Sequence, residues 1–383
     1  MRTIQVVNVR WYNATAWYGV TLAHCLKKAG HESIVAGLAG TPPLEKAKEL
    51  GLPVVALPFN SQTPGKLLEL WRGMDLLVRR FRPDIVNCHR GEAFILWALM
   101  KQRHDFALVR TRGDRRLPRG GAVNRWLHCH AADAVISTNS LMTRHFSEAL
   151  QVPSDRLHTI LGGVDTVRFH ADPQAGAEIR RQYGYGEDDV VMGLLGRMDE
   201  VKGIRESIAA LARARELSPE ARRIRFLVIG FDSEFTTEDV ARWTRECGLG
   251  ELGDIVTVTG RVSRPQEVIC ALDFGILASL GSEAIARAAL EIMACGVPLI
   301  SSTTGVMPDL LPAEYCFEPG DTQAMAERMI QALDVAWRKK LAAVCLDRIF
   351  KGGLTLDDFL ASTMQVYEGV LASRGRGITS VWS

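Results

Sequence analysis

Features typical of membrane, secreted and fibrous proteins are missing from the 383 residues of the chain. The longest apolar run, AFILWALM at 93–100, falls far short of the ~20 residues that a membrane helix needs. The N-terminal sequence MRTIQVVNVRW holds too short an apolar run for a signal peptide. No low-complexity stretch occurs, because 34 glycines and 15 prolines are spread along the chain. We therefore expect a cytoplasmic globular protein, long enough for two domains of ordinary size.

Paired cysteines and familiar nucleophile motifs are also missing. Eight cysteines occur, but no two of them form a CxxC motif. Most lie inside apolar strand or helix patterns, which indicates free thiols in a reducing compartment rather than disulfides or a metal site. The sequence also contains no GxSxG and no GxxxxGK[ST], so it offers neither a hydrolase-type serine elbow nor a P-loop.

The chain has little excess of either sign of charge, since its net charge is only +2, but the charged residues are unevenly distributed along it. Residues 1–170 hold 23 Lys and Arg against 13 Asp and Glu, a balance of +10. Residues 171–383 hold 23 against 31, a balance of −8. This asymmetry indicates two halves with different partners, and it favours an anionic partner for the first half.

Apolar runs alternate with helical patterns, which indicates parallel sheets covered by helices on both faces. The first series of expected strands is 3–9, 32–38, 54–59, 84–89, 107–111 and 134–138. After GGVDTVRFHADP (162–173), a second series follows at 190–196, 226–230, 254–260, 274–279 and 298–302. The sequence predicts an α/β protein with two doubly wound, Rossmann-like domains, 1–165 and 166–355, that face a cleft. The C-terminal segment 356–383 is expected to be helical and could cross back onto the first domain.

Ligands of open parallel sheets bind beyond the carboxyl ends of the strands, which directs attention to the segment GLLGRMDEVKG at 193–203. Gly196 ends an expected strand, and Arg197 and Lys202 follow in a turn. Two cations at this place could clamp a diphosphate, with a bidentate guanidinium and a compact ammonium. Alternatively, they are solvated loop cations. A second phosphate-ready segment favours the diphosphate site.

That second segment is SLGSEAIARAALEIMACGVP, directly after the expected strand 274–279. Ser282 is a suitable N-cap for a helix from about Glu283 to Cys295, whose free N–H groups would form an anion site. Glu283 lies eight residues before Glu291. The pair Glu238 and Glu246 has the same spacing but is surrounded by polar residues, so we interpret it as solvated surface. Glu283 could also merely complement the helix dipole.

Together, three motifs resemble the donor half of retaining GT-B glycosyltransferases of family 4. They are G-R-x(4)-K-G at 196–203, G-S-E-x(7)-E at 281–291 followed by A-C-G-V-P, and GGVD-x(3)-F at 162–169. The resemblance implies that Arg197 and Lys202 hold the donor diphosphate and that Glu283 contacts the transferred sugar. It implies that Glu291 binds the ribose hydroxyls.

The resemblance also assigns backbone groups near Ala284 and Ile285 to the donor site, and it places Gly260 and Arg261 beside the nucleobase. It implies retention of the anomeric configuration, no metal and no cofactor, with the leaving diphosphate taking the acceptor proton. Arg287, between the two glutamates, could point to the same site or lie on the outer face.

The first half departs from the family's usual loops. In WYNATAWYG (11–19), Asn13 could cap a helix that begins near Thr15 and leave N–H groups for a ligand, or it could simply close a turn. His89, at the end of an expected strand, would face the cleft, in either a functional or a structural role.

Five arginines crowd the segment VRTRGDRRLPRGG (109–121), and we expect them on one loop: Arg110, Arg112, Arg115, Arg116 and Arg119. They form either a solvated face or an anion site. Asp114 among them could pair with an arginine or accept a hydrogen bond from an acceptor substrate.

These observations predict a retaining, metal-independent glycosyltransferase of the hexosyltransferase type. It would move a sugar from a nucleotide-diphosphate sugar, a UDP- or GDP-sugar, to a hydroxyl of an anionic envelope glycan or glycolipid, as in lipopolysaccharide or polysaccharide biosynthesis. We expect it in the cytoplasm, in peripheral contact with the inner membrane, and without a nucleic-acid partner.

Two other functions remain open. One is a nucleotide-sugar epimerase of GT-B fold, which would convert UDP-GlcNAc without an acceptor and would need acid and base groups in the first domain. The other is a catalytically inactive GT-B protein that binds a nucleotide sugar or a glycan. The intact set Arg197, Lys202, Glu283 and Glu291 argues against the inactive protein.

Overall fold

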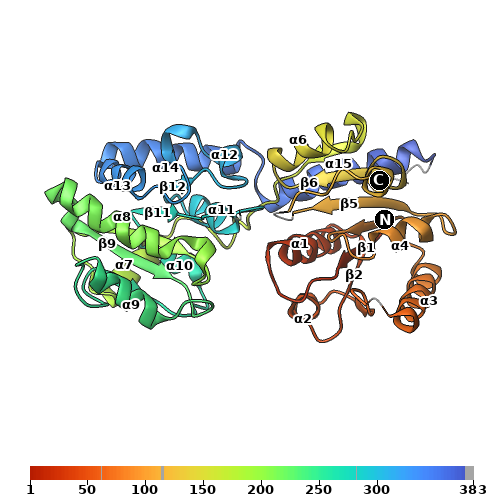
Figure 1. Cartoon of the computed structure of the whole chain (residues 1–383), viewed down its shortest axis with the longest axis horizontal. Helices are drawn as coiled ribbons and strands as arrows, with labels where there is room; N and C mark the ends of the chain where they lie inside the picture. Colours follow the sequence, from red (N-terminus) through yellow and green to blue (C-terminus); the bar gives the residue numbers. More distant parts are fainter. Residues whose placement is uncertain (62, 114–115, 282, 376–383) are drawn as a thin grey trace. The chain divides into compact units, whose positions relative to one another are not determined.

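The computed structural model describes residues 1–61, 63–113, 116–281 and 283–375, and the chain forms two α/β units (Figure 1). The first unit comprises Met1–Gly162 together with the chain from Leu356 onward. The second unit comprises Gly163–Thr355. The boundary therefore lies three residues before the one expected from the sequence, and the C-terminal helix belongs to the first unit.

The first unit is built on a parallel sheet of seven strands in the order β3-β2-β1-β4-β5-β6-β7. The strands are β1 (Arg2–Val7), β2 (Glu32–Gly37), β3 (Val54–Ala56), β4 (Ile85–Cys88), β5 (Ala107–Arg112), β6 (Ala134–Ser137) and β7 (Leu157–Thr159). Six of them correspond to expected strands, although β1 begins one residue earlier and β5 ends one residue later than expected. The seventh, β7, was not expected, because it has only three residues and no buried apolar run.

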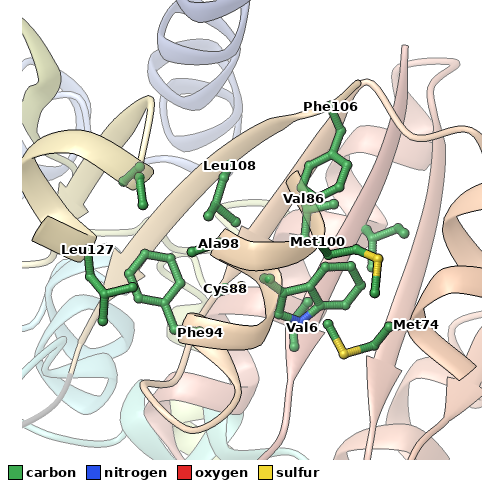
Figure 2. Packing of buried hydrophobic residues seen from close by; sticks show 14 of the residues in the cluster. Val6, Met74, Val86, Cys88, Phe94, Ala98, Met100, Phe106, Leu108 and Leu127 are labelled. Atoms are coloured by element: carbon green, nitrogen blue, oxygen red, sulfur yellow. The ribbon is translucent and has the colours of Figure 1, made fainter. Parts of the chain in front are cut away.

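Helices cover both faces of this sheet. They are α1 (Ala14–Lys28), α2 (Pro42–Glu49), α3 (Pro64–Phe81), α4 (Phe94–Lys101), α5 (Ala122–Trp126), the π-helical turn η1 (Leu127–Ala131), α6 (Ser140–Glu148) and α15 (Leu356–Ser373). Figure 2 shows Phe94, Ala98 and Met100 of α4 packed with Val86 and Leu108 of the sheet. Burial of such apolar surface is the main force that holds each helix on the sheet.

The C-terminal helix α15 is fixed to the first unit by both apolar and polar contacts. Phe359 meets the ring of Tyr18 of α1 edge-on, with centroids 4.6 Å apart. The Tyr367 hydroxyl accepts a hydrogen bond of 2.8 Å from Asn87 Nδ2 in β4 and one of 3.3 Å from Gln5 Nε2 in β1. The chain thus returns to the first unit after it has built the second.

The second unit contains a parallel sheet of six strands in the order β10-β9-β8-β11-β12-β13. The strands are β8 (Val190–Leu195), β9 (Ile224–Ile229), β10 (Val256–Val258), β11 (Phe274–Leu277), β12 (Leu299–Ser302) and β13 (Cys316–Phe317). The five expected strands are present. The sixth, β13, is only two residues long and was not expected.

Its helices are α7 (Pro173–Gln182), α8 (Ile204–Leu217), α9 (Thr237–Glu246), α10 (Pro265–Ile269), α11 (Arg287–Ala294), α12 (Met307–Leu310), α13 (Thr322–Gln331) and α14 (Val335–Phe350). The predicted architecture of two doubly wound α/β domains is therefore confirmed. Across the described part of the chain, no helix combines the length and the apolar character that a membrane crossing demands.

Candidate functional site

Two loops of the second unit meet at the carboxyl edge of its sheet. One follows β8 (residues 196–203) and the other follows the neighbouring strand β11 (residues 278–283, of which 282 is not described). The backbone N–H of Leu280 donates to the carbonyl of Val201 at 2.8 Å. Gly203 has φ +67°, and a Cβ there would lie 2.1 Å from the Ala278 carbonyl oxygen. A glycine is therefore required for the close approach that brings the two loops together.

This approach pairs Lys202 with Glu283. Lys202 Nζ lies 2.5 Å from Glu283 Oε1, and the two side chains are only 19% and 6% exposed. The Ser279 hydroxyl donates to the same carboxylate oxygen at 2.5 Å. The Glu283 carbonyl accepts a hydrogen bond of 2.8 Å from the Val306 N–H. The site thus holds a largely buried, firmly placed carboxylate–ammonium pair, of the kind whose disruption is costly.

Arg197, the second predicted cation, is held more loosely. Its side chain is 61% exposed, and Nη2 lies 3.1 Å from Asp199 Oδ2. The Asp199 side chain is nearly buried, and burial raises the pKa of its carboxyl, while the charges of Arg197 and Lys202 lower that pKa. Asp199 was not among the predicted site residues, although a carboxylate between two cations was visible in the sequence. Because Arg197 is exposed, it can turn toward an anion at little cost.

The helix after this loop begins later than the sequence predicted. It runs over Arg287–Ala294, and Ala286, at φ 49° and ψ 50°, precedes it in a left-handed conformation. The prediction that the helix starts at Glu283 is therefore wrong, because a left-handed residue interrupts right-handed helix geometry. Glu283, Ala284 and Ile285 instead lie in the loop before the helix, and Ile285 is buried. The predicted N-cap, Ser282, lies outside the described residues.

Glu291 lies in α11 with 12% of its side chain exposed, and Arg287 Nη2 donates to its Oε1 at 2.8 Å. Arg287 is thus oriented toward Glu291, one turn along the helix. Glu238 and Glu246 have the same spacing as Glu283 and Glu291 but a different environment. Both are exposed, and Glu246 lies 3.8 Å from Arg242 on the surface of α9. The prediction that this second pair is solvated surface is confirmed.

Gly196, Gly260 and Arg261 also lie beyond the ends of strands. Gly196 follows β8, and its N–H donates to Ile229 O of β9 at 3.0 Å. Gly260 follows β10 and has φ +69°. The Arg261 guanidinium lies 4.0 Å from the centroid of the Phe231 ring, which follows β9. Arg261 and Phe231 form a cation–π pair beside the loop of Arg197, and Phe231 is a further residue that the sequence analysis missed.

The first unit has its own pocket, of about 760 Å³, at the carboxyl edge of its sheet. Three loops line it, after β1, β3 and β4. Asn8 Nδ2 donates to Asn60 Oδ1 at 2.9 Å, and Asn60 Nδ2 donates to Asn8 O at 3.1 Å. These two bonds join the loops after β1 and β3. This pocket was not predicted from the sequence, because its walls come from loops far apart in the chain.

The pocket has an apolar wall and charged groups. Trp11, which is 73% exposed, and Ile95 contribute to the wall, together with Leu67, Leu70 and Leu96. Arg90 forms two hydrogen bonds with Glu92, of 3.0 and 2.7 Å, so these charges offset one another. Arg10 is an exposed cation in the lining. Such a lining suits a molecule with both apolar and anionic parts.

Asn13 also lines this pocket, and its role is now defined. Its Oδ1 accepts a hydrogen bond of 3.1 Å from the Ala16 N–H, so it caps α1. Thr15, in the first turn of α1, is buried. The capping alternative is therefore confirmed, and a turn closed by Asn13 alone is not.

His89 is buried rather than open to a ligand. Its Nε2 lies 2.9 Å from Gln5 Oε1. Burial, together with the charge of Arg110, lowers the pKa of His89 to about 3, so the imidazole is neutral near pH 7. The structure therefore gives His89 the environment of a structural histidine.

The arginine-rich segment divides into buried and exposed parts. Arg110 lies inside β5, fully buried, and its Nη1 donates to the carbonyls of Cys88 at 2.7 Å and Thr111 at 2.8 Å. The expectation that the five arginines lie on one loop is wrong for Arg110 and Arg112, because β5 extends to Arg112. The Arg112 Nη2 donates to Arg116 O at 2.5 Å. Arg116 and Arg119 are exposed. Asp114 and Arg115 lie outside the described residues.

No group of three or more His, Cys, Asp or Glu side chains has the arrangement of a metal site among the residues that the structure describes.

Two protein-family models match the chain, one in each half. Residues 16–168 match the model described as Glycosyltransferase Family 4. Residues 189–334 match the model described as Glycosyl transferases group 1. The loops that carry Arg197, Lys202 and Glu283 lie in the second of these segments, and most of the pocket of the first unit lies in the first.

Curated relatives of the chain include proteins named as glycosyltransferases. The D-inositol 3-phosphate glycosyltransferase of Stackebrandtia nassauensis is 28% identical over 244 residues, which are 60% of this chain and 54% of the relative. The GDP-mannose-dependent alpha-(1-6)-phosphatidylinositol monomannoside mannosyltransferase of Mycobacterium tuberculosis is 30% identical over 185 residues, 46% of each protein. The chain thus spans about half the length of these relatives.

Solved structures agree with the chain over nearly its whole length. A glycosyltransferase from Rickettsia africae has a TM-score of 0.84 at 17% identity, and the match covers 97% of this chain and 98% of that one. Anabaena HepE in complex with UDP has a TM-score of 0.82 at 16% identity, with 97% and 100% covered. At this identity the likeness shows the fold alone.

Proposed function

We propose, from the premise that both halves of this chain are glycosyltransferase family domains in a GT-B fold, that it transfers a sugar from a nucleoside diphosphate to a hydroxyl acceptor. The observation that carries the proposal is the Lys202–Glu283 pair at the carboxyl edge of β8 and β11, with Arg197 beside it on the same loop. It places two cations and a fixed carboxylate where ligands of parallel sheets bind.

The donor diphosphate would bind to Lys202 and Arg197 in different ways. The Lys202 ammonium has three N–H donors, of which Glu283 takes one, so two can meet phosphate oxygens without breaking the buried pair. Arg197 would leave Asp199 for the diphosphate, since its side chain is exposed and its ion pair with Asp199 is weak. Lys202 is therefore the fixed part of the clamp and Arg197 the adjustable part.

Glu283 would position the transferred sugar. Both of its side-chain hydrogen bonds converge on Oε1, and no described residue donates a hydrogen bond to Oε2. That second oxygen can accept a hydrogen bond from a sugar hydroxyl. Glu291 would bind the ribose hydroxyls, and Arg261, stacked on Phe231, would lie by the base of a UDP- or GDP-sugar.

The transfer would proceed with retention and without a metal. The bond from the anomeric carbon to the diphosphate oxygen breaks, and a bond to the acceptor oxygen forms on the same face of the sugar. The acceptor proton passes to the departing diphosphate. Negative charge grows on that diphosphate in the transition state, where Arg197 and Lys202 stabilise it most.

The acceptor would bind in the pocket of the first unit, with an apolar part against Trp11 and Ile95 and an anionic group near Arg10. An anionic glycan or glycolipid fits this lining, and the balance of +10 in residues 1–170 supports it. The relatives' names contain an inositol phosphate and a phosphatidylinositol monomannoside, which are also phosphorylated. An acceptor of lipopolysaccharide or polysaccharide biosynthesis, met at the inner membrane, remains our proposal.

A donor panel tests this function. UDP-, GDP- and ADP-sugars are added to the purified chain, and binding, nucleotide release and product anomer are measured with and without a phosphorylated acceptor. We expect one donor to bind, with acceptor-dependent release that persists in EDTA. Loss of activity in EDTA that Mg²⁺ or Mn²⁺ restores would contradict metal independence. Conversion of the sugar without an acceptor would indicate an epimerase, and binding without turnover an inactive protein.

A further inference from the structure

The carboxylate of Asp199 lies on the loop of the candidate donor site, and its side chain is only 10% exposed. Asp199 follows Arg197 by two residues and precedes the short turn that ends at Lys202. Its backbone N–H donates to the Arg197 carbonyl at 3.0 Å, and its own carbonyl accepts a hydrogen bond of 3.1 Å from the Lys202 N–H. These two bonds hold the carboxylate between the two cations that are proposed to bind the donor diphosphate.

The ionised form of this carboxylate depends on few groups. Asp199 Oδ2 lies 3.1 Å from Arg197 Nη2, whereas no described residue donates a hydrogen bond to the buried Oδ1. The ammonium of Lys202 is already paired with Glu283. Burial of an ionised carboxylate is costly unless an opposite charge accompanies it. The main counter-ion of Asp199 is therefore Arg197, whose side chain is 61% exposed and easily moved.

A further carboxylate lies near Asp199. Glu234 belongs to the loop after β9, and its Oε2 accepts a hydrogen bond of 3.2 Å from the Glu200 N–H. This bond joins the loops after β8 and β9 next to Asp199. Burial raises the pKa of the Asp199 carboxyl, the charge of Glu234 raises it further, and the charges of Arg197 and Lys202 lower it.

Binding of the donor would make these surroundings more negative. The diphosphate carries negative charge to the loop and draws Arg197 toward itself, so Asp199 loses its counter-ion and gains like charges. Both burial and a nearby like charge disfavour the ionised form of a carboxyl group. A proton on Asp199 removes the repulsion, and its O–H becomes a hydrogen-bond donor that the ionised carboxylate lacks.

We propose that binding of the donor is coupled to the uptake of a proton by Asp199, which positions Arg197 in the free chain and makes donor affinity depend on pH. The proposal rests on the proposed function, because it assumes that the diphosphate binds at Arg197 and Lys202. In the free chain the ionised carboxylate holds Arg197 on its loop. In the complex a proton from solvent takes the place of Arg197, so donor affinity rises as the pH falls.

Few other groups can account for such a proton. The charged side chains around Asp199 are Arg197, Lys202 with its partner Glu283, and the exposed Glu234. The second unit contains a single histidine, His170, whose carbonyl oxygen lies 3.4 Å from Cys270 Sγ, before β11 and thus at the opposite edge of the sheet. The diphosphate of a sugar nucleotide does not titrate between pH 5.5 and 7.5, because it is esterified at both ends. An uptake in this range therefore indicates a carboxyl group of the site.

Isothermal titration calorimetry of the full chain tests the coupling, with UDP-glucose, GDP-mannose and ADP-glucose as probes. Titrations at pH 6 in two buffers of different ionisation enthalpy give the number of protons taken up, and Kd is compared at pH 5.5 and 7.5. We expect an uptake of at least about 0.3 proton per donor bound and binding at least about threefold tighter at pH 5.5, where one coupled proton allows at most tenfold per pH unit.

Asp199→Asn keeps the shape of the side chain but cannot take up the proton. This variant should bind the donor at pH 7.5 about threefold more tightly than the wild type does at that pH, with no proton uptake and no dependence on pH. A merely structural role of Asp199 would instead weaken binding at both pH values. Glu200→Gln is the matched control, because Glu200 is the adjacent and exposed carboxylate, and it should keep the wild-type uptake.

The wild-type titrations decide the question even if Asp199→Asn folds poorly. Binding of a donor without proton uptake would overturn the coupling and leave the proposed function standing. Uptake that persists in Asp199→Asn would assign the proton to another carboxyl group, such as that of Glu234, and would also overturn it. Failure of all three probes to bind at either pH would overturn the proposed function, and the coupling with it.

Discussion

The buried pair of Lys202 and Glu283 allows a quantitative test of the candidate donor site. The change Lys202→Met removes the ammonium but keeps much of the apolar stem, and it leaves a carboxylate that is 6% exposed with only the Ser279 hydroxyl as a hydrogen-bond donor among the described residues. Removing one partner of a buried ion pair costs about 3–5 kcal/mol. Lys202 is 19% exposed, so water can enter in its place, and we expect about 3 kcal/mol.

A double-mutant cycle isolates the pair. Glu283→Gln alone should cost less, about 1–2 kcal/mol, because a lysine with a flexible stem can turn to solvent. The double variant should be more stable than the sum of the two changes by about 2 kcal/mol, since the uncompensated charge is then gone. Urea unfolding, monitored through the hydrogen exchange of peptides from the second unit, measures these free energies.

The same variants report on catalysis. Lys202→Met should reduce kcat/KM by at least about 30-fold, which corresponds to about 2 kcal/mol of transition-state stabilisation. Glu238→Ala is the control, because this glutamate is exposed on α9. If the single variants stay within 0.5 kcal/mol of wild type, on the order of an ordinary surface substitution, or if their effects simply add, the pair does not have the energetic role assigned to it.

Three further predictions concern donor and acceptor. Arg197→Ala should lower kcat/KM by at least about 30-fold with little loss of stability, because the side chain is 61% exposed; a destabilised fold would contradict this. Glu291→Ala should weaken nucleotide binding, measured by calorimetry, whereas Glu246→Ala should not. Equal effects would remove the basis for choosing Glu283 and Glu291 over Glu238 and Glu246. Trp11→Ala and Arg10→Ala should each raise the acceptor KM. The KM should rise strongly with salt only in the wild-type and Trp11→Ala enzymes, which keep the Arg10 charge, since exposed charges are screened beyond ~10 Å at 0.1 M. A KM that salt does not change in any of the three would indicate a neutral acceptor.

The alternation of apolar runs and helical patterns was sufficient to predict both sheets, because a strand buried on both faces must be apolar throughout. It failed for β7 and β13, which have three and two residues and make no such run. The predicted start of α11 was also wrong. Ser282 and Glu283 look like the beginning of a helix, but Ala286 adopts a left-handed conformation that alanine rarely has, and the sequence carries no signal for it.

The candidate donor residues could be predicted because loops after neighbouring parallel strands meet at one edge, and Lys202 and Glu283 do meet there. The arginines of the first half show the opposite case. Arg110 and Arg116 have the same charge and lie six residues apart, yet one is fully buried against backbone carbonyls and the other is exposed. Arg110 lies inside β5 and Arg116 beyond its end at Arg112, and residue type alone does not reveal where that strand ends.

Acid should destabilise the first unit through His89. Its pKa is lowered to about 3 by burial and by the charge of Arg110, whereas the unfolded chain has the ordinary value of about 6.5. Between these values the unfolded state binds more protons than the folded state, so stability falls as pH falls, by about 1.4 kcal/mol per pH unit.

The loss attributable to His89 should reach about 2 kcal/mol between pH 6.5 and 5. His128, whose pKa burial lowers to about 4, adds a similar slope over much of the same range. His89→Gln cannot take up this proton, and its amide can still meet Gln5, which lies 2.9 Å from the imidazole Nε2. The variant should therefore lose the part of the wild-type slope that is due to His89 and keep the parts due to His128 and to His31 and His158, whose pKa values burial also lowers. Hydrogen exchange of peptides that span β4, measured from pH 7 to 5 and corrected for intrinsic exchange rates, gives both slopes. An unchanged slope in His89→Gln would mean that His89 is protonated in the folded chain at these pH values, and that its burial does not hold it neutral.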